Sequence, residues 1–279
     1  MADDISICIP AVNGRHIRES LDSIFCSGFD DFEVIVNDSS SNFIISDVIS
    51  DYDVRIIKKQ TKSFESRYIS VMAAKGNKIL LFDETRMMKA TLLERLSLMQ
   101  NDMVIIGEKE IGKGIITFIS NLDKQAVQRE PELLNPMKNK SIIPRFYNRT
   151  VIIEALRDIS RNLPSHLLNQ VVGLDLELIY LESYNISDNI GIIPTQEILH
   201  YGDENFRAVF KKYHRYGHTQ RMLRNTYYHE FANISGRNRS TGSFKDGVLS
   251  IPLQVMRGIP FLLGYISGDK IRSNNGKKE

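Results

Sequence analysis

Short apolar segments alternate with amphipathic ones along the first part of the chain. Segments of four to six residues, rich in Ile, Val and Leu, have the length and composition of strands buried on both faces: residues 5–10, 32–36, 54–57, 78–82 and 103–107. Apolar residues recur at helical spacing between them, at 15–27, 64–75 and 91–99. Strands that alternate with helices predict an α/β fold, in which helices flank a mostly parallel sheet.

The middle of the chain is less regular. Residues 108–145, with Lys, Gln, Asn and Pro, read as a variable insertion whose role the sequence does not give. Beyond it the pattern predicts strands and helices at residues 142–147, 151–160, 165–183, 190–193 and 198–199. A long helix is expected to begin at Asp203.

Polar residues follow three of the predicted strands. Asn13, Asp38 and Asp83 each come just past a strand end. The carboxyl ends of parallel strands meet at one edge of the sheet, and ligands bind beyond that edge. The residues alone therefore predict a ligand site there.

The composition limits the partners and the compartment. The net charge is +2, so the chain as a whole is no obvious binder of polyanions. Its two cysteines lack metal-site spacing, and the acidic N-terminal sequence Met-Ala-Asp-Asp is unlike a secretory signal. No uninterrupted apolar run reaches the ~18 residues of a membrane span. These features predict a cytoplasmic protein without a simple transmembrane helix.

The C-terminal part is basic and aromatic. Residues 206–245 contain nine Lys or Arg and one acid, with Phe and Tyr interleaved. Residues 248–267 are largely apolar but are interrupted by Arg257 and two Pro, which suits a pair of interfacial helices. We expect residues 203–268 to contact a membrane surface at the inner face of the cell membrane. Packing or homodimerisation is the alternative, and nucleic acid is not expected as a partner.

Several short motifs occur in an order that resembles the family-2 inverting glycosyltransferases of the GT-A fold. Each is weak alone, and together they span roughly residues 5 to 220: Ile9 to Arg15, Asn37 to Ser40, Arg67-Tyr68, Ala74 to Gly76, the strand into Asp83, Gly173 to Asp175, and His200 followed by Lys211 to Tyr213 and Gly217. The resemblance implies a catalytic domain over 1–202. Its Rossmann-like nucleotide-binding half is 1–107 and its acceptor half 108–202, and a helical extension over 203–279 follows.

The resemblance also implies an activity and the residues that perform it. A sugar would pass with inversion from a UDP- or GDP-sugar to the hydroxyl of a glycan or lipid-linked acceptor. Asp175 would be the general base, because one carboxylate suffices when the leaving diphosphate is an anion. Donor contacts would come from Pro10, Asn13, Asp38, Arg67 and Asp83. A Mg²⁺ or Mn²⁺ ion would bind Asp83, and either Glu84 would supply a further carboxylate or Asp83 would work with His200.

Each of these residues also has an ordinary structural interpretation. Asp83 could cap the following helix, and Asp38 could be a turn residue in a Ser-rich loop. Arg67 and Asp175 could be solvated charges on helix surfaces. His200 could be a satisfied structural histidine.

The chain also departs from the family pattern. Thr85 replaces the second Asp of the usual Asp-x-Asp metal motif. This departure leaves open a non-catalytic binding module descended from a transferase. A sugar-phosphate nucleotidyltransferase is a further alternative, although only Gly14 and Arg15 are present where such enzymes have a Gly-rich basic loop.

Overall fold

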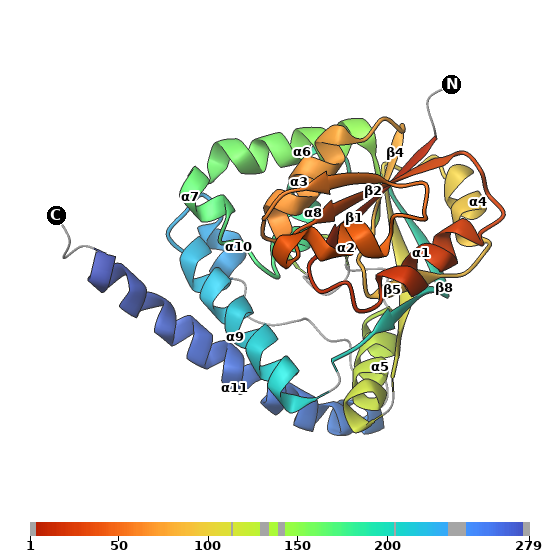
Figure 1. Ribbon diagram of the computed structural model, residues 1–279. Helices are drawn as coiled ribbons and strands as arrows, with labels where there is room; N and C mark the ends of the chain where they lie inside the picture. Colours follow the sequence, from red (N-terminus) through yellow and green to blue (C-terminus); the bar gives the residue numbers. More distant parts are fainter. Residues whose placement is uncertain are drawn as a thin grey trace.

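One mixed sheet forms the centre of the molecule (Figure 1). The computed structural model describes residues 4–112, 114–128, 134–138, 143–203, 205–233 and 244–275. Within them the sheet has eight strands in the order β3-β2-β1-β4-β7-β6-β8-β5. The strands are β1 (Ile5–Ala11), β2 (Phe32–Asp38), β3 (Arg55–Lys58), β4 (Lys78–Leu81), β5 (Arg86–Met88), β6 (Met103–Ile111), β7 (Phe146–Asn148) and β8 (Ile190–Tyr201).

The pairing of the strands is mostly parallel. The pairs β1–β2, β2–β3, β1–β4 and β6–β8 are parallel, whereas β4–β7, β6–β7 and β5–β8 are antiparallel. Strand β7 joins the two parallel parts, because it pairs with β4 on one side and β6 on the other. The predicted α/β fold is confirmed.

Helices cover both faces of the sheet. Side chains alternate along β1, so Ile7 and Ile9 belong to one core and Cys8 to the other. The first core lies under α1, α2 and α4, and the second under α3, α6 and α8. The helices are α1 (Ile17–Phe25), α2 (Ile44–Val48), α3 (Ser63–Ala73), α4 (Leu92–Ser97), α5 (Ile115–Gln128), α6 (Arg149–Asn162), α7 (Ser165–Leu168), α8 (Asp175–Ile186), α9 (Phe206–Leu223), α10 (His229–Asn233) and α11 (Phe244–Asn275), with a short 3₁₀ turn at Ser41–Phe43.

The expected insertion at 108–145 is wrong over its first part. Strand β6 continues to Ile111, and helix α5 follows it. The inner side of α5 includes the buried polar residues Thr117 and Ser120. Residues 129–133 and 139–142 lie outside the described residues.

Two other predicted boundaries need correction. The expected helix at 165–183 is interrupted between α7 and α8, where Gly173 has φ +84°, a backbone conformation that favours glycine. The expected strands at 190–193 and 198–199 are one strand, β8, with register shifts opposite Gly107. Strand β5 was not expected.

The C-terminal segment forms one helix where two were expected. Helix α11 contains Pro252 and Pro260 and lies along α9 (Figure 1). The helices approach closely at two glycines: a Cβ on Gly217 would lie 1.9 Å from the carbonyl oxygen of Phe261, and one on Gly264 would lie 1.9 Å from that of His214. This packing on α9 stabilises α11 as one helix although it contains two prolines. None of the helices described is sufficiently long and apolar to span a membrane.

Candidate active site

An arginine in the core joins two of the acids that the sequence singled out. Arg67, on α3, is only 5% exposed. It donates from Nε to Asp175 Oδ2 at 2.7 Å and from Nη2 to Asp83 Oδ1 at 2.6 Å. Its remaining nitrogen, Nη1, reaches the carbonyl oxygen of Phe82 at 3.4 Å. The fold therefore brings three distant residues together at the carboxyl end of β4.

The backbone around Asp175 explains its position. Asp175 is the first residue of α8, where the helix dipole favours a negative charge. Its Oδ1 accepts a hydrogen bond from the Gly173 N–H at 3.1 Å. A Cβ on Gly173 would overlap the ring of Tyr216 on α9, so this turn accepts only glycine. Helix α9 thereby holds the turn that presents the carboxylate.

Two further arginines surround Asp83. Arg86 and Arg145 both contact Asp83 Oδ2, Arg145 at 3.3 Å. Both also donate from Nε to Glu108 Oε1, at 3.2 and 3.1 Å. Lys124 of α5 approaches the other oxygen of Glu108 at 3.5 Å. Asp83 thus belongs to a network in which positive and negative side chains alternate.

The charges of this network shift one another's pKa values. Burial lowers the pKa of Arg86 to about 10, and Arg145 acts in the same direction. Burial would raise the pKa of the Glu108 carboxyl, but Arg86 and Arg145 hold it well below its usual range. Burial, together with the charges of Arg86 and Lys124, keeps the pKa of His200 well below its usual value. At neutral pH Arg86 and Glu108 are therefore charged and His200 is neutral.

Glu84 turns away from Asp83. Its carboxylate accepts hydrogen bonds from the backbone N–H groups of Val12, Asn13 and Gly14, at 3.3, 3.1 and 2.7 Å. Glu84 therefore ties the loop after β1 to the end of β4. Pro10 lies just before this loop, within β1.

These placements bear on the expected metal set of Asp83, Glu84 and His200. Guanidinium groups contact both oxygens of Asp83, and Glu84 is bound to backbone N–H groups. His200 Nδ1 is buried without a hydrogen-bond partner, 4.0 Å from Glu110. In the portion of the chain that the structure describes, no three His, Cys, Asp or Glu side chains are grouped so that they could hold a metal ion. The surroundings of Asp83 are cationic and do not fit Mg²⁺ or Mn²⁺, which take several oxygen ligands.

Asp38 organises its own loop. Its side chain is fully buried. Oδ1 accepts from N and Oγ of Ser40 at 2.9 and 2.6 Å, and Oδ2 accepts from N and Oγ of Ser46 at 2.8 and 2.7 Å. Burial alone would raise the pKa of Asp38, but these hydrogen bonds lower it. In this structure the Asp38 carboxylate holds the loop, and its contact with a base or ribose stays a prediction.

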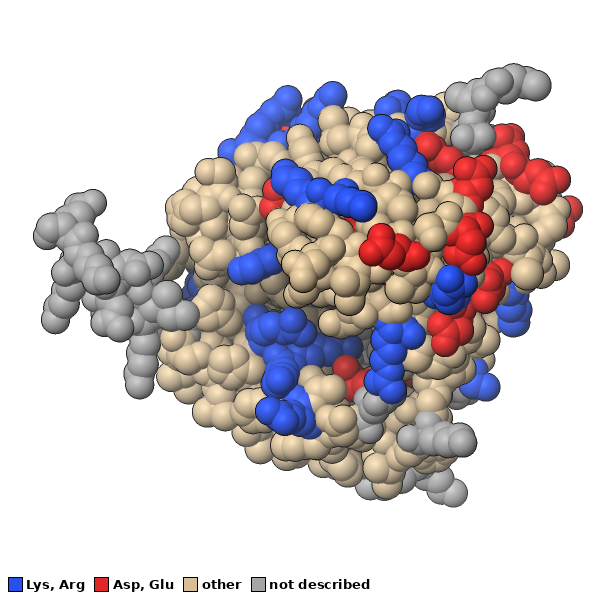
Figure 2. All heavy atoms as spheres, in the orientation of Figure 1, with Lys and Arg blue, Asp and Glu red and all other residues tan. Residues whose placement is uncertain are grey.

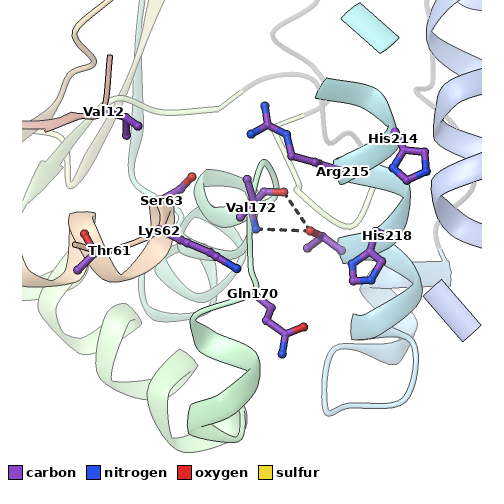
Figure 3. Close-up of a pocket in the computed structure, with 10 residues that line it drawn as sticks. Val12, Thr61, Lys62, Ser63, Gln170, Val172, His214, Arg215 and His218 are labelled. Atoms are coloured by element: carbon purple, nitrogen blue, oxygen red, sulfur yellow. Dashed lines mark hydrogen bonds between the residues drawn. The ribbon is translucent and has the colours of Figure 1, made fainter. Parts of the chain in front are cut away.

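A cavity of about 390 Å³ opens between α9 and the loop before α3. Lys62 lines one wall, and Arg215 and His218 line the other. Figure 3 shows the side chains of Lys62 and Arg215 directed toward the space between these walls. Two hydrogen bonds between Thr219 Oγ1 and the backbone of Val172, at 3.4 and 3.0 Å, join α9 to the segment before α8. The cavity therefore offers positive charge beside a hydrogen-bonded frame.

A second hollow, of about 700 Å³, lies on the other side of the loop after β1. Val12 borders the first cavity and Asn13 the second, so this loop separates them. The ring of Tyr201, at the end of β8, stacks on His16 with centroids 3.7 Å apart, and Arg15 also lines the hollow. Figure 2 shows Lys and Arg side chains gathered around a depression on this face of the molecule.

Several residues of the site were not found from the sequence. Arg86 follows Asp83 by three residues, and this spacing could have indicated an ion pair between them. The strand that contains Arg86 was not expected. Glu108 and Arg145 lie at the two ends of the segment that was read as an insertion. Lys62 carried no signal of its own.

Comparison with known proteins places this geometry in a known fold. No protein-family model matches the chain, and no curated protein matches it in sequence. Among solved structures it resembles S. aureus TarS (residues 1–349) in complex with UDP-GlcNAc, with a TM-score of 0.56 and 14% identity over 97% of this chain and 92% of that one. It also resembles the mannosyltransferase PcManGT from Pyrobaculum calidifontis in complex with GDP-Man and Mn²⁺, with a TM-score of 0.57 and 11% identity over 95% and 86%. The chain shares their GT-A-like fold, as the order of its motifs implied.

The Arg67 contacts lead to a prediction about stability. Arg67→Ala leaves two carboxylates without their buried partner, so it should lower the free energy of unfolding by about 3–5 kcal/mol. Arg18→Ala removes an exposed pair with Asp51 and should change stability little. Urea denaturation of the three proteins measures both effects. Equal stability of the two variants would show that the Arg67 bridge is not a structural element.

Proposed function

We propose that this chain is a nucleotide-sugar-dependent glycosyltransferase that acts with inversion. The observation that supports it most is the Arg67 bridge between Asp83 and Asp175, at the carboxyl end of β4. Ligands of α/β sheets bind at this edge. The structures with the same fold that were compared contain UDP-GlcNAc or GDP-Man, which favours the same ligand class here.

In this proposal the nucleotide occupies the cavity between α3 and α9. Lys62 and Arg215 are both exposed cations that line it from opposite walls. Charge-assisted hydrogen bonds to phosphate oxygens are stronger than neutral ones, so these side chains favour an anionic ligand. The backbone at Val12 would contact the nucleotide from the loop after β1.

Asp175 is the proposed general base. A single positioned carboxylate is enough to take the proton of an attacking hydroxyl when the leaving group is already an anion. Each oxygen of Asp175 accepts one hydrogen bond in the structure, from Arg67 or from Gly173. A carboxylate oxygen can accept a second, so Asp175 keeps the capacity to accept a hydrogen bond from an acceptor hydroxyl. Arg67 would act as a positioning residue that fixes the direction of this carboxylate.

The acceptor is proposed to enter through the larger hollow. A glycan presents hydroxyl groups and apolar ring faces. The stacked rings of His16 and Tyr201 offer a flat surface for such a face, and Asn13, Asp203 and Asn205 offer polar groups around it. A polar hollow with an aromatic floor favours a carbohydrate over an apolar acceptor.

We further propose that helix α11 holds the enzyme at an anionic membrane surface, where a lipid-linked acceptor would be found. A stripe of apolar side chains at helical spacing is about half exposed: Ile251, Val255, Ile259, Leu262 and Ile266. Arg224 of α9 donates a hydrogen bond to the Tyr265 hydroxyl, and Arg221 lies over its ring, so cations lie beside this stripe. An apolar face with adjacent cations suits an interfacial helix.

The base assignment gives the first test. Asp175→Asn keeps the shape of the side chain but removes its basicity, so kcat should fall by about 10²-fold or more. Nucleotide affinity should stay close to that of the native protein. Glu177→Gln, on the first turn of the same helix, should keep near-normal turnover. Sugar transfer from UDP- and GDP-sugars to an acceptor mixture is the assay, and native turnover in the Asp175 variant would refute the assignment.

The membrane proposal has its own test. The chain should sediment with phosphatidylcholine vesicles that contain phosphatidylglycerol and much less with phosphatidylcholine alone. The double substitution Ile259→Glu and Leu262→Glu should abolish this binding. Leu98→Glu, at a 74% exposed site in another part of the fold, should not. A dimer in solution that the double variant dissociates, with no vesicle binding by the native chain, would instead assign the stripe to contact between copies.

A further inference from the structure

The surroundings of Asp83 differ from those of a metal-binding carboxylate. Both of its oxygens already contact guanidinium groups: Oδ1 contacts Arg67, and Oδ2 contacts Arg86 and Arg145. Thr85 offers a hydroxyl where a second carboxylate would otherwise follow. A divalent cation at Asp83 would lie beside three guanidinium groups, whose positive charge repels it.

We infer that Arg86 and Arg145 take the place of the divalent cation, so that the donor diphosphate binds at Asp83 without metal. This inference rests on the proposed function, because it concerns the charge that the diphosphate of the donor meets. It assigns a ligand-binding role to two residues that were not among the predicted site residues.

The charge of the site supports this assignment. Two guanidinium groups on the two carboxylates of Asp83 and Glu108 carry the same total charge as one divalent cation on two carboxylates. Glu108 Oε1 accepts from Nε of both arginines, at 3.2 and 3.1 Å, and so holds the two positive groups side by side. The carboxylates thus position cations in this chain, as metal-binding carboxylates do elsewhere.

The hydrogen-bond geometry supports it further. Arg86 and Arg145 each use Nε for Glu108 and Nη1 for Asp83. In the described part of the chain, no acceptor is hydrogen bonded to Nη2 of either residue. Arg67 differs, because all three of its guanidinium nitrogens are used. The Nη2 groups of Arg86 and Arg145 therefore remain for phosphate oxygens beside Asp83, and each of the two residues is 7% exposed.

The other two residues of the expected metal set, Glu84 and His200, do not contact Asp83. The carboxylate of Glu84 binds the N–H groups of the loop after β1 and fixes its shape. His200 pairs along the backbone with Arg86, in β8 and β5, so its ring lies near that guanidinium. Neither residue brings an oxygen or nitrogen ligand to Asp83.

Metal binding by the full chain is the first measurement. The electron paramagnetic resonance signal of free Mn²⁺ should be the same with and without one equivalent of protein, and also when UDP or GDP is present at matched concentration. Binding of one Mn²⁺ per chain that is lost in Asp83→Asn would overturn the inference. This arm gives a result even if no nucleotide binds, in which case the proposed function fails on its own.

Nucleotide affinity is the second measurement. Calorimetry with the preferred nucleoside diphosphate should give the same dissociation constant in EDTA and in Mn²⁺, within about twofold. Affinity that falls by about tenfold or more in EDTA would contradict the inference.

The role of Arg86 is tested by comparing phosphates. Arg86→Gln should weaken nucleoside diphosphate binding by about tenfold and monophosphate binding much less, because one hydrogen bond to a charged group is lost. A structural role alone would lower the melting temperature without changing the ratio of the two affinities. Arg95→Gln, at an exposed arginine that pairs with the buried Glu197, is the matched control and should leave the ratio unchanged. If Arg86→Gln does not fold, the same comparison on Arg145→Gln and the two measurements on the native chain decide the question.

Discussion

The buried guanidinium of Arg67 is the contact on which the geometry of the site depends. It is held between Asp83, which follows β4, and Asp175, which begins α8. Removing two carboxylates and an arginine from water is costly, so the bridge persists only where the geometry satisfies every charged group. Because Asp83 and Asp175 are far apart in the sequence, this one side chain joins α3, the end of β4 and the start of α8.

Three other carboxylates hold parts of the backbone or positively charged side chains in place. Glu84 closes the loop after β1, Asp38 closes the loop after β2, and Glu108 holds Arg86 and Arg145 beside Asp83. The acidic residues at the edge of the sheet are therefore bound to groups of the protein itself. The edge of the sheet is positively charged. Lys62 and Arg215 supply this charge in the cavity, and Arg86 and Arg145 supply it beside Asp83.

Much of the fold was predictable because its strands are short, continuous runs of apolar and β-branched residues. The grouping of Asp83 with its neighbours at one edge followed from strand order. The metal set was not predictable, since the direction of the Glu84 carboxylate depends on three backbone N–H groups of a loop 70 residues earlier. Arg145 and Glu108 meet only because β6 and β7 pair, and that pairing is not local. Helix α11 was read as two pieces because proline rules describe isolated helices, whereas packing on α9 maintains this one.

A thermal-shift screen with UDP, GDP, dTDP and CMP tests whether a sugar nucleotide binds at the edge of the sheet. A ligand present at about 100 times its dissociation constant stabilises the folded state by roughly 2.7 kcal/mol. The account predicts that one nucleoside diphosphate raises the melting temperature with or without Mn²⁺, and that Arg215→Ala removes much of the shift. No shift with any of the four nucleotides would contradict the account and favour a non-catalytic module.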